Sequence, residues 1–136
     1  MLPDEMLKVI RQWINRAEED FRNAEYTLTL KEDCPFGTIC FHAEQCVEKY
    51  LKALLVFKGI DFPKTHNIPE EVALLPALVR PALSAEEQEQ LTDYATVLRY
   101  PGDWEPITRE DAEAAVKVAR KVREAVRKHL PGGVLG

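Results

Sequence analysis

The sequence predicts an all-α protein, an up-and-down helical bundle of about five helices. Apolar residues recur at steps of three and four along most of the chain, which is the spacing of one helix face. Prolines, glycines and capping residues interrupt this pattern where helices would end, and no segment is convincing as a strand. From the length of 136 residues we expect a single domain over residues 1–130 and a flexible tail over residues 131–136.

Two long helices are predicted in the first half of the chain, over residues 4–30 and 38–58. Pro35 and Gly37 break the pattern between them, and Gly59 is suited to cap the second helix. The first core stripe consists of Met6, Ile10, Trp13, Ala17, Phe21, Ala24 and Leu28. The second consists of Ile39, Ala43, Val47, Tyr50, Leu51 and Leu54. Each stripe predicts the face that its helix buries.

Shorter helices are predicted in the middle of the chain. Residues 60–67 show no period and are interpreted as an ordered loop, after which Pro69 stands in the first turn of a third helix. Ser84 and Glu87 have the spacing of a capping box that opens a fourth helix, which extends to about residue 98.

A fifth helix is predicted from a second capping pair, Thr108 and Asp111, to about Leu130. Small apolar residues form its core stripe, which suits close packing against another helix. They are Ala112, Ala115, Ala119, Val122 and Val126. The proline and glycines at residues 131–133 then end the helix.

The composition excludes several classes of protein. A content of 46% hydrophobic and 30% charged residues is typical of a folded globular domain, and the longest apolar run, residues 53–57, is far too short to span a bilayer. We therefore expect a cytoplasmic protein with no membrane association. Cys34, Cys40 and Cys46 fit neither a metal pair nor a disulfide framework, so we interpret them as small core residues and predict no metal or cofactor.

The charge argues against unaided binding of duplex nucleic acid. The formal net charge is −5, whereas counterion release rewards clustered cations, so only a local basic groove stays open. Cations do gather near the C-terminus, where they complement a helix dipole, and we interpret them as a solvated face. They are Lys117, Arg120, Lys121, Arg123, Arg127 and Lys128.

Two irregular elbows carry most of the chemical groups, residues 63–67 (PKTHN) and 98–104 (LRYPGDW). Together they hold a histidine, an arginine, a lysine and two aromatic side chains, a set suited to phosphate contact and base stacking. For His66 the alternative is a cap on the third helix, and for Arg99 it is an ion pair with a nearby aspartate.

The second predicted helix adds a polar face that borders the elbows in our interpretation, with side chains at steps of three and four. These are His42, Gln45, Lys49 and Lys52. The alternative is a solvated helical face in which Glu48 and Lys52 pair across one turn. That face would contain Glu44, Glu48, Lys49 and Lys52.

Four segments are similar, in order and in spacing, to one known family. They are residues 13–21 (WINRAEEDF), 41–54 (FHAEQCVEKYLKAL), 63–67 (PKTHN) and 98–101 (LRYP). Together they resemble the HEPN domain family over residues 13–126. The resemblance implies a helical bundle, often a homodimer, that is frequently encoded beside a minimal nucleotidyltransferase in two-component toxin–antitoxin systems.

The resemblance also bears on catalysis. Many HEPN members are metal-independent ribonucleases with an arginine, four to six intervening residues and a histidine. The arginine position here is Arg99, but residues 104–106 (WEP) stand where the histidine belongs. Arg123 and His129 match the spacing formally, yet six residues place them about 120° apart on a helix, so we regard that match as chance.

Three functions stay open at this point. The first is a nucleotide-binding module that partners a nucleotidyltransferase, with Tyr100 or Trp104 stacking on a base. Its phosphate contacts would come from Lys49, Lys52, Lys64, His66 and Arg99. The second is a ribonuclease that uses His66 as the base and Arg99 to stabilise the phosphate. The third is a purely structural dimeric interaction protein, with Tyr100 and Trp104 in the interface.

Overall fold

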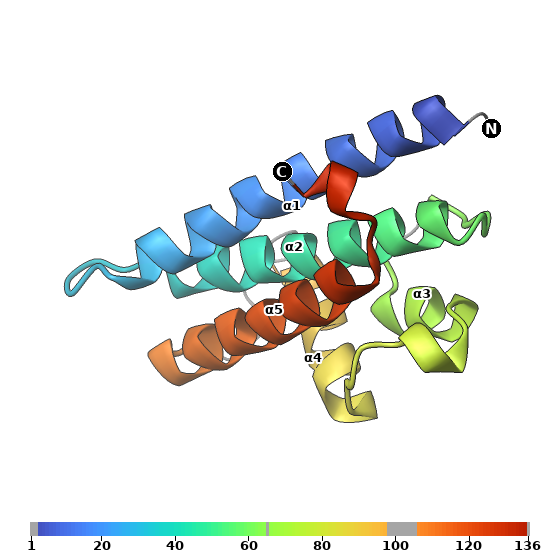
Figure 1. Ribbon diagram of the computed structural model, residues 1–136. Coiled ribbons are helices and arrows are strands. Elements are labelled where there is room, and N and C mark those ends of the chain that lie inside the picture. The colour runs from blue at the N-terminus through green and yellow to red at the C-terminus, as the bar shows by residue number, and fades with distance from the viewer. Residues whose placement is uncertain (1–2, 65, 98–105, 136) are drawn as a thin grey trace.

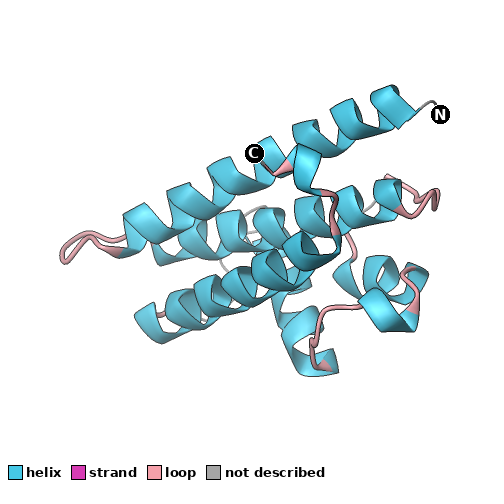
Figure 2. Ribbon diagram, viewed as in Figure 1, coloured by secondary structure: helices cyan, strands magenta, loops and turns pink. Residues whose placement is uncertain are grey.

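The computed structural model describes residues 3–64, 66–97 and 106–135. Within these ranges every regular element is a helix and no strand occurs (Figure 2). The predicted all-α bundle is therefore confirmed. Arg99, Tyr100 and Trp104, the candidate residues of the second elbow, lie outside the described residues.

Helix α2 (Phe36–Phe57) lies at the centre of the bundle (Figure 1). It contacts α1 (Pro3–Leu28), α3 (Ile68–Leu74), α4 (Ala85–Val97) and α5 (Arg109–His129). Each residue of its predicted core stripe has 0% exposed surface. Because four helices surround α2, few of its side chains reach solvent, and even part of its polar face is buried.

Local sequence signals set several helix ends as predicted, although α2 begins at Phe36, two residues before the predicted start, and contains Gly37 in its first turn. Gly59 follows α2 with φ of +69°, and its N–H donates to the Val56 carbonyl at 3.0 Å. Before α4, the N–H of Ser84 donates to Glu87 at 2.9 Å and the N–H of Glu87 donates to Ser84 Oγ at 3.0 Å. The capping box that opens α5 is formed in the same way, by Thr108 and the aspartate three residues later.

The cap of α3 is Asn67. Its side-chain Oδ1 accepts a hydrogen bond from the N–H of Glu70 at 2.9 Å. The interpretation of His66 as the cap is therefore wrong, because the residue one position later supplies the short acceptor that the first turn needs. A 3₁₀ turn, η1 (Ala77–Val79), then connects α3 to α4.

The C-terminal residues return to α1 (Figure 1). A second 3₁₀ turn, η2 (Gly132–Val134), packs against that helix, and Val134 is buried. Arg11 of α1 donates two hydrogen bonds to the Gly133 carbonyl, at 2.8 and 3.3 Å. The segment predicted as a tail thus has an apolar contact through Val134 and a polar contact through Gly133.

The central position of α2 predicts that substitutions in its buried face destabilise the protein. We expect Leu51→Ala, at a site with 0% exposure, to lower the free energy of unfolding by about 2–5 kcal/mol, because it leaves a cavity in the core. The matched control is Leu78→Ala, at a site 94% exposed, which we expect to change it by less than about 0.5 kcal/mol. Urea unfolding followed by circular dichroism measures both, and equal effects would contradict this arrangement.

Candidate functional site

The loop that contains the first elbow, described over residues 60–64 and 66–67, is held against three helices. At its end Ile68 is fully buried, and its N–H donates to Thr92 Oγ1 of α4 at 3.3 Å. In its middle, Phe62 packs edge-on against Trp13 of α1, with ring centroids 6.4 Å apart. The elbow also continues directly from the C-terminus of α2. A rigid scaffold therefore presents this loop.

The most distinctive feature of the elbow is a carboxylate–histidine pair. Nδ1 of His66 lies 2.9 Å from Oε2 of Glu48 on α2. The Glu48 side chain is only 2% exposed, whereas that of His66 is 52% exposed. Gln45 donates a further hydrogen bond to the same Glu48 oxygen at 3.1 Å. The buried carboxylate thus fixes the orientation of an imidazole whose ring reaches the surface.

The two predicted phosphate-binding lysines near the elbow have different environments. Lys64 is exposed and forms no ion pair with the described residues. Lys52 is buried, with Nζ 3.9 Å from Oε1 of Glu71 and above the rings of Trp13 and Phe62. The surroundings of Lys52 favour an interior role, so we do not carry it forward as a phosphate ligand.

The third predicted lysine, Lys49, lies on the side of α2 that faces α1. Its Nζ donates to Oδ2 of Asp20 at 2.5 Å, and Nδ1 of His42 lies 2.8 Å from the other oxygen of the same carboxylate. The predicted polar face of α2 therefore divides into two clusters, one toward α1 and one toward the elbow.

The interpretation of the α2 acids as a solvated face is wrong. Glu44 and Glu48 are 0% and 1% exposed, and Glu71 of α3, which packs on this side of α2, is 2% exposed. Four of their oxygens have no hydrogen-bond partner among the described residues. These three residues form what we call the carboxyl cluster.

The surroundings raise the pKa of two members of the carboxyl cluster. Burial, followed by the proximity and charge of Glu48, raises the pKa of Glu44 to about 10. Burial and the charge of Glu48 raise the pKa of Glu71 to about 8, against the opposing effect of Lys52. Like charges so close together and so far from water cannot all be ionised, so protonation of two members allows the cluster to exist.

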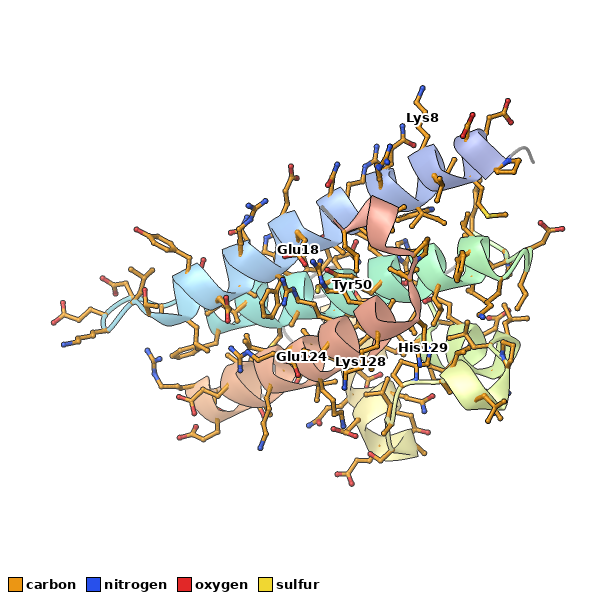
Figure 3. All side chains as sticks on the ribbon, in the orientation of Figure 1. Lys8, Glu18, Tyr50, Glu124, Lys128 and His129 are labelled. Atoms are coloured by element: carbon orange, nitrogen blue, oxygen red, sulfur yellow. The ribbon has the colours of Figure 1, made fainter. Side chains whose placement is uncertain are left out.

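A second network lies where α1, α2 and α5 meet (Figure 3). Glu18 accepts hydrogen bonds from the Tyr50 hydroxyl, from Arg123 at 2.6 Å and from Arg127 at 3.1 Å. Burial alone would raise the pKa of Glu18, but the bonds from Arg123 and Tyr50 outweigh it and lower that pKa. The solvated-face interpretation is wrong for these two arginines. They tie α5 to α1 and have partners within the chain.

Other candidate chemistry is absent from the described ranges. Cys40 and Cys46 are fully buried, as predicted, and burial raises the pKa of the Cys40 thiol to about 12. Residues 3–64, 66–97 and 106–135 contain no group of acids, histidines and cysteines that could hold a metal ion. In the same ranges no helix is long and apolar enough to cross a membrane.

Comparison with known proteins shows which family has this architecture. The HEPN domain profile matches residues 10–129, which is most of the chain and includes the helices and the elbow described above. The chain belongs to the HEPN family. The resemblance seen in the sequence is therefore confirmed.

Three HEPN-like relatives illustrate the match. A Methanocaldococcus jannaschii protein named "Putative toxin MJ1304" is 30% identical, with 91% of this chain and 90% of that protein covered. The crystal structure of TT1696 from Thermus thermophilus superposes with a TM-score of 0.70 at 26% identity, over 89% of this chain and 98% of that one. ST0689, an archaeal HEPN homologue, gives a TM-score of 0.65 at 26% identity, over 88% and 96% of the two chains.

The carboxyl cluster predicts how stability depends on pH. An unfolded glutamate titrates near pH 4.5 and folded Glu71 near 8, so between these values the folded state keeps a proton that the unfolded state has released. The free energy of unfolding must therefore fall as the pH rises through this window. We expect Glu71→Gln to remove part of this dependence. Its free energy of unfolding, relative to that of the wild type, should rise by about 2–4 kcal/mol from pH 5 to pH 8.

Urea unfolding at both pH values measures this gain. Glu113→Gln, a change at an exposed position on α5, is the matched control and should run parallel to the wild type. Parallel behaviour of Glu71→Gln as well would show that Glu71 is ionised in the folded state.

Proposed function

We propose that this HEPN chain is the nucleotide-binding component of a toxin–antitoxin-type system, and that it binds nucleotide or RNA phosphate at the first elbow. The observation that carries the proposal is the Glu48–His66 pair, in which a buried carboxylate orients a half-exposed imidazole. An ionised carboxylate can only accept, so Nδ1 donates to it and Nε2 is available to a ligand. Exposed Lys64 lies two residues away on the same elbow.

The electrostatics of the pair suit an anionic ligand. An imidazole that carries hydrogen on both nitrogens presents a second N–H donor at Nε2. A hydrogen bond between charged groups contributes about 1.5–3 kcal/mol, enough to give one phosphate contact a measurable effect. Membership of the HEPN family supports this assignment, and so does the 30% identical relative that is named "Putative toxin MJ1304".

The same proposal includes the partners. In accordance with the family resemblance, we place the chain in a homodimer that acts with a minimal nucleotidyltransferase as the second component. Expression in a bacterial host tests this directly: growth arrest by the HEPN chain, relieved by a co-expressed minimal nucleotidyltransferase, is the expected result. Growth unaffected by either protein would remove the two-component assignment.

A second candidate function rests on the same geometry. A carboxylate that holds the Nδ1–H of a histidine is also the arrangement that prepares Nε2 to accept a proton. In this alternative the chain is a metal-independent ribonuclease in which Nε2 of His66 takes the proton of the attacking 2′-hydroxyl. The missing histidine after Arg99 is the reason to place this function second.

One experiment separates the candidates. Purified protein is titrated with ATP by calorimetry, and a mixed RNA pool is incubated with it and examined on a gel. We expect ATP binding that weakens at least about tenfold in His66→Gln, which is a loss of about 1.4 kcal/mol. His129→Gln, at an exposed histidine at the end of α5, is the matched control and should bind as the wild type does.

Each outcome selects one function. Binding without cleavage, weakened only in His66→Gln, supports the binding module. RNA cleavage that disappears in His66→Gln and persists in His129→Gln supports the ribonuclease. A wild-type protein that neither binds ATP nor cleaves RNA would leave the structural interaction protein and refute both proposals.

A further inference from the structure

The α1-facing cluster of α2 contains a second histidine held by a carboxylate. Oδ1 of Asp20 is 2.8 Å from Nδ1 of His42, and Oδ2 of Asp20 is 2.5 Å from Nζ of Lys49. The Asp20 side chain is 11% exposed, while those of His42 and Lys49 are 24% and 23% exposed. The acid therefore lies below the surface, and the imidazole and the ammonium group reach it.

The Asp20 carboxylate brings the side-chain ends of His42 and Lys49 close together. His42 and Lys49 are seven residues apart on α2, which separates their backbones by about 10 Å along the helix axis. Both nevertheless contact one carboxylate, one at each oxygen. The ring of Phe41 packs edge-on against that of His42, with centroids 5.6 Å apart, and further limits its orientation.

The cluster has donors beyond those that Asp20 uses. An ammonium group has three N–H donors and Lys49 directs one to Asp20, while the imidazole of His42 keeps Nε2. Two cationic side chains on one carboxylate give a local charge of +1 when His42 is protonated. A single lysine would suffice to neutralise Asp20, so an interhelical ion pair alone does not account for the histidine.

Gln45 connects this cluster to the elbow. Gln45 stands one helical turn from both His42 and Lys49, and it donates to Glu48, the residue that holds His66. Positions 42 and 48 are about 9 Å apart along the helix axis. Two phosphate sites at separate positions require a ligand with more than one phosphate, which a short oligonucleotide provides and AMP does not.

We propose that Asp20, His42 and Lys49 form a second phosphate subsite, which takes another phosphate of a short single-stranded RNA whose first phosphate is bound at the elbow. The inference rests on the proposed function and extends it, because it makes the ligand an oligonucleotide rather than a mononucleotide. His42 and Lys49 contact the phosphate, and Asp20 is a positioning residue that holds both.

The test compares two ligands, AMP and a 5′-phosphorylated RNA tetranucleotide, by calorimetry. In Lys49→Gln the tetranucleotide should bind about tenfold more weakly, while AMP binding stays as in the wild type. The slope of log K against log salt for the tetranucleotide should fall by about 0.7, the value for one phosphate contact on a single strand. Lys8→Gln is the matched control, because Lys8 points away from the bundle (Figure 3).

Histidine variants distinguish the subsites. His42→Asn keeps an N–H donor near Asp20 and should lose only the tetranucleotide advantage, whereas His66→Gln should weaken both ligands. Unchanged tetranucleotide affinity in both His42→Asn and Lys49→Gln, with weaker AMP binding in His66→Gln, would overturn the second subsite alone. Unchanged AMP binding in His66→Gln would instead overturn the elbow site.

A measurement on the wild-type protein guards against misfolded variants. Imidazole nitrogen resonances are followed by NMR during titration with the tetranucleotide. A shift at Nε2 of both His42 and His66 is the expected result. A shift confined to His66 would refute the second subsite.

Discussion

Burying the carboxylate of Glu48 at 1% exposure costs several kcal/mol unless hydrogen bonds replace its water. Two bonds contribute to that replacement, one from Gln45 on the same helix and one from His66 on the elbow. The elbow contact is the more consequential, because residues 48 and 66 belong to different elements. Satisfying an acid in the centre of the bundle thereby determines where the elbow histidine points.

The burial that constrains Glu48 also affects the neighbouring acids. Because burial and the charge of Glu48 raise the pKa of Glu44 and of Glu71, the carboxyl cluster contains fewer charges than its composition suggests. The stability of the HEPN fold and the orientation of its candidate site are thus coupled through a few acids on α2 and α3. A change that ionises the cluster would disturb both.

Much of the fold follows from local signals in the sequence. The apolar stripes of α2 and α5 and the capping boxes at Ser84 and Thr108 act within a few residues, so they can be recognised without tertiary structure. The sequence pattern favours a solvent-exposed position for the acids of α2, because they lie opposite its core stripe. Short α3 covers them, and no local pattern specifies where a seven-residue helix docks.

The candidate site was predictable in part for the same reason. Residue types alone drew attention to His66 and Lys49, but their partners, Glu48 and Asp20, are 18 and 29 residues away in the chain. From the sequence, Arg123 and Arg127 are expected to complement a helix dipole. In the structure both bind Glu18, which is more than 100 residues away in the chain. Contacts at such separations depend on how helices pack, which periodicity does not encode.

The state of the His66 ring tests the central claim most directly. Nitrogen NMR of the imidazole, in the wild type and in Glu48→Gln, reports which nitrogen carries hydrogen and whether nucleotide contacts the ring. We predict a hydrogen on Nδ1 that is protected from exchange in the wild type, loss of that protection in Glu48→Gln, and an Nε2 shift when AMP is added. An unprotected ring that is identical in both proteins and insensitive to AMP would contradict this account.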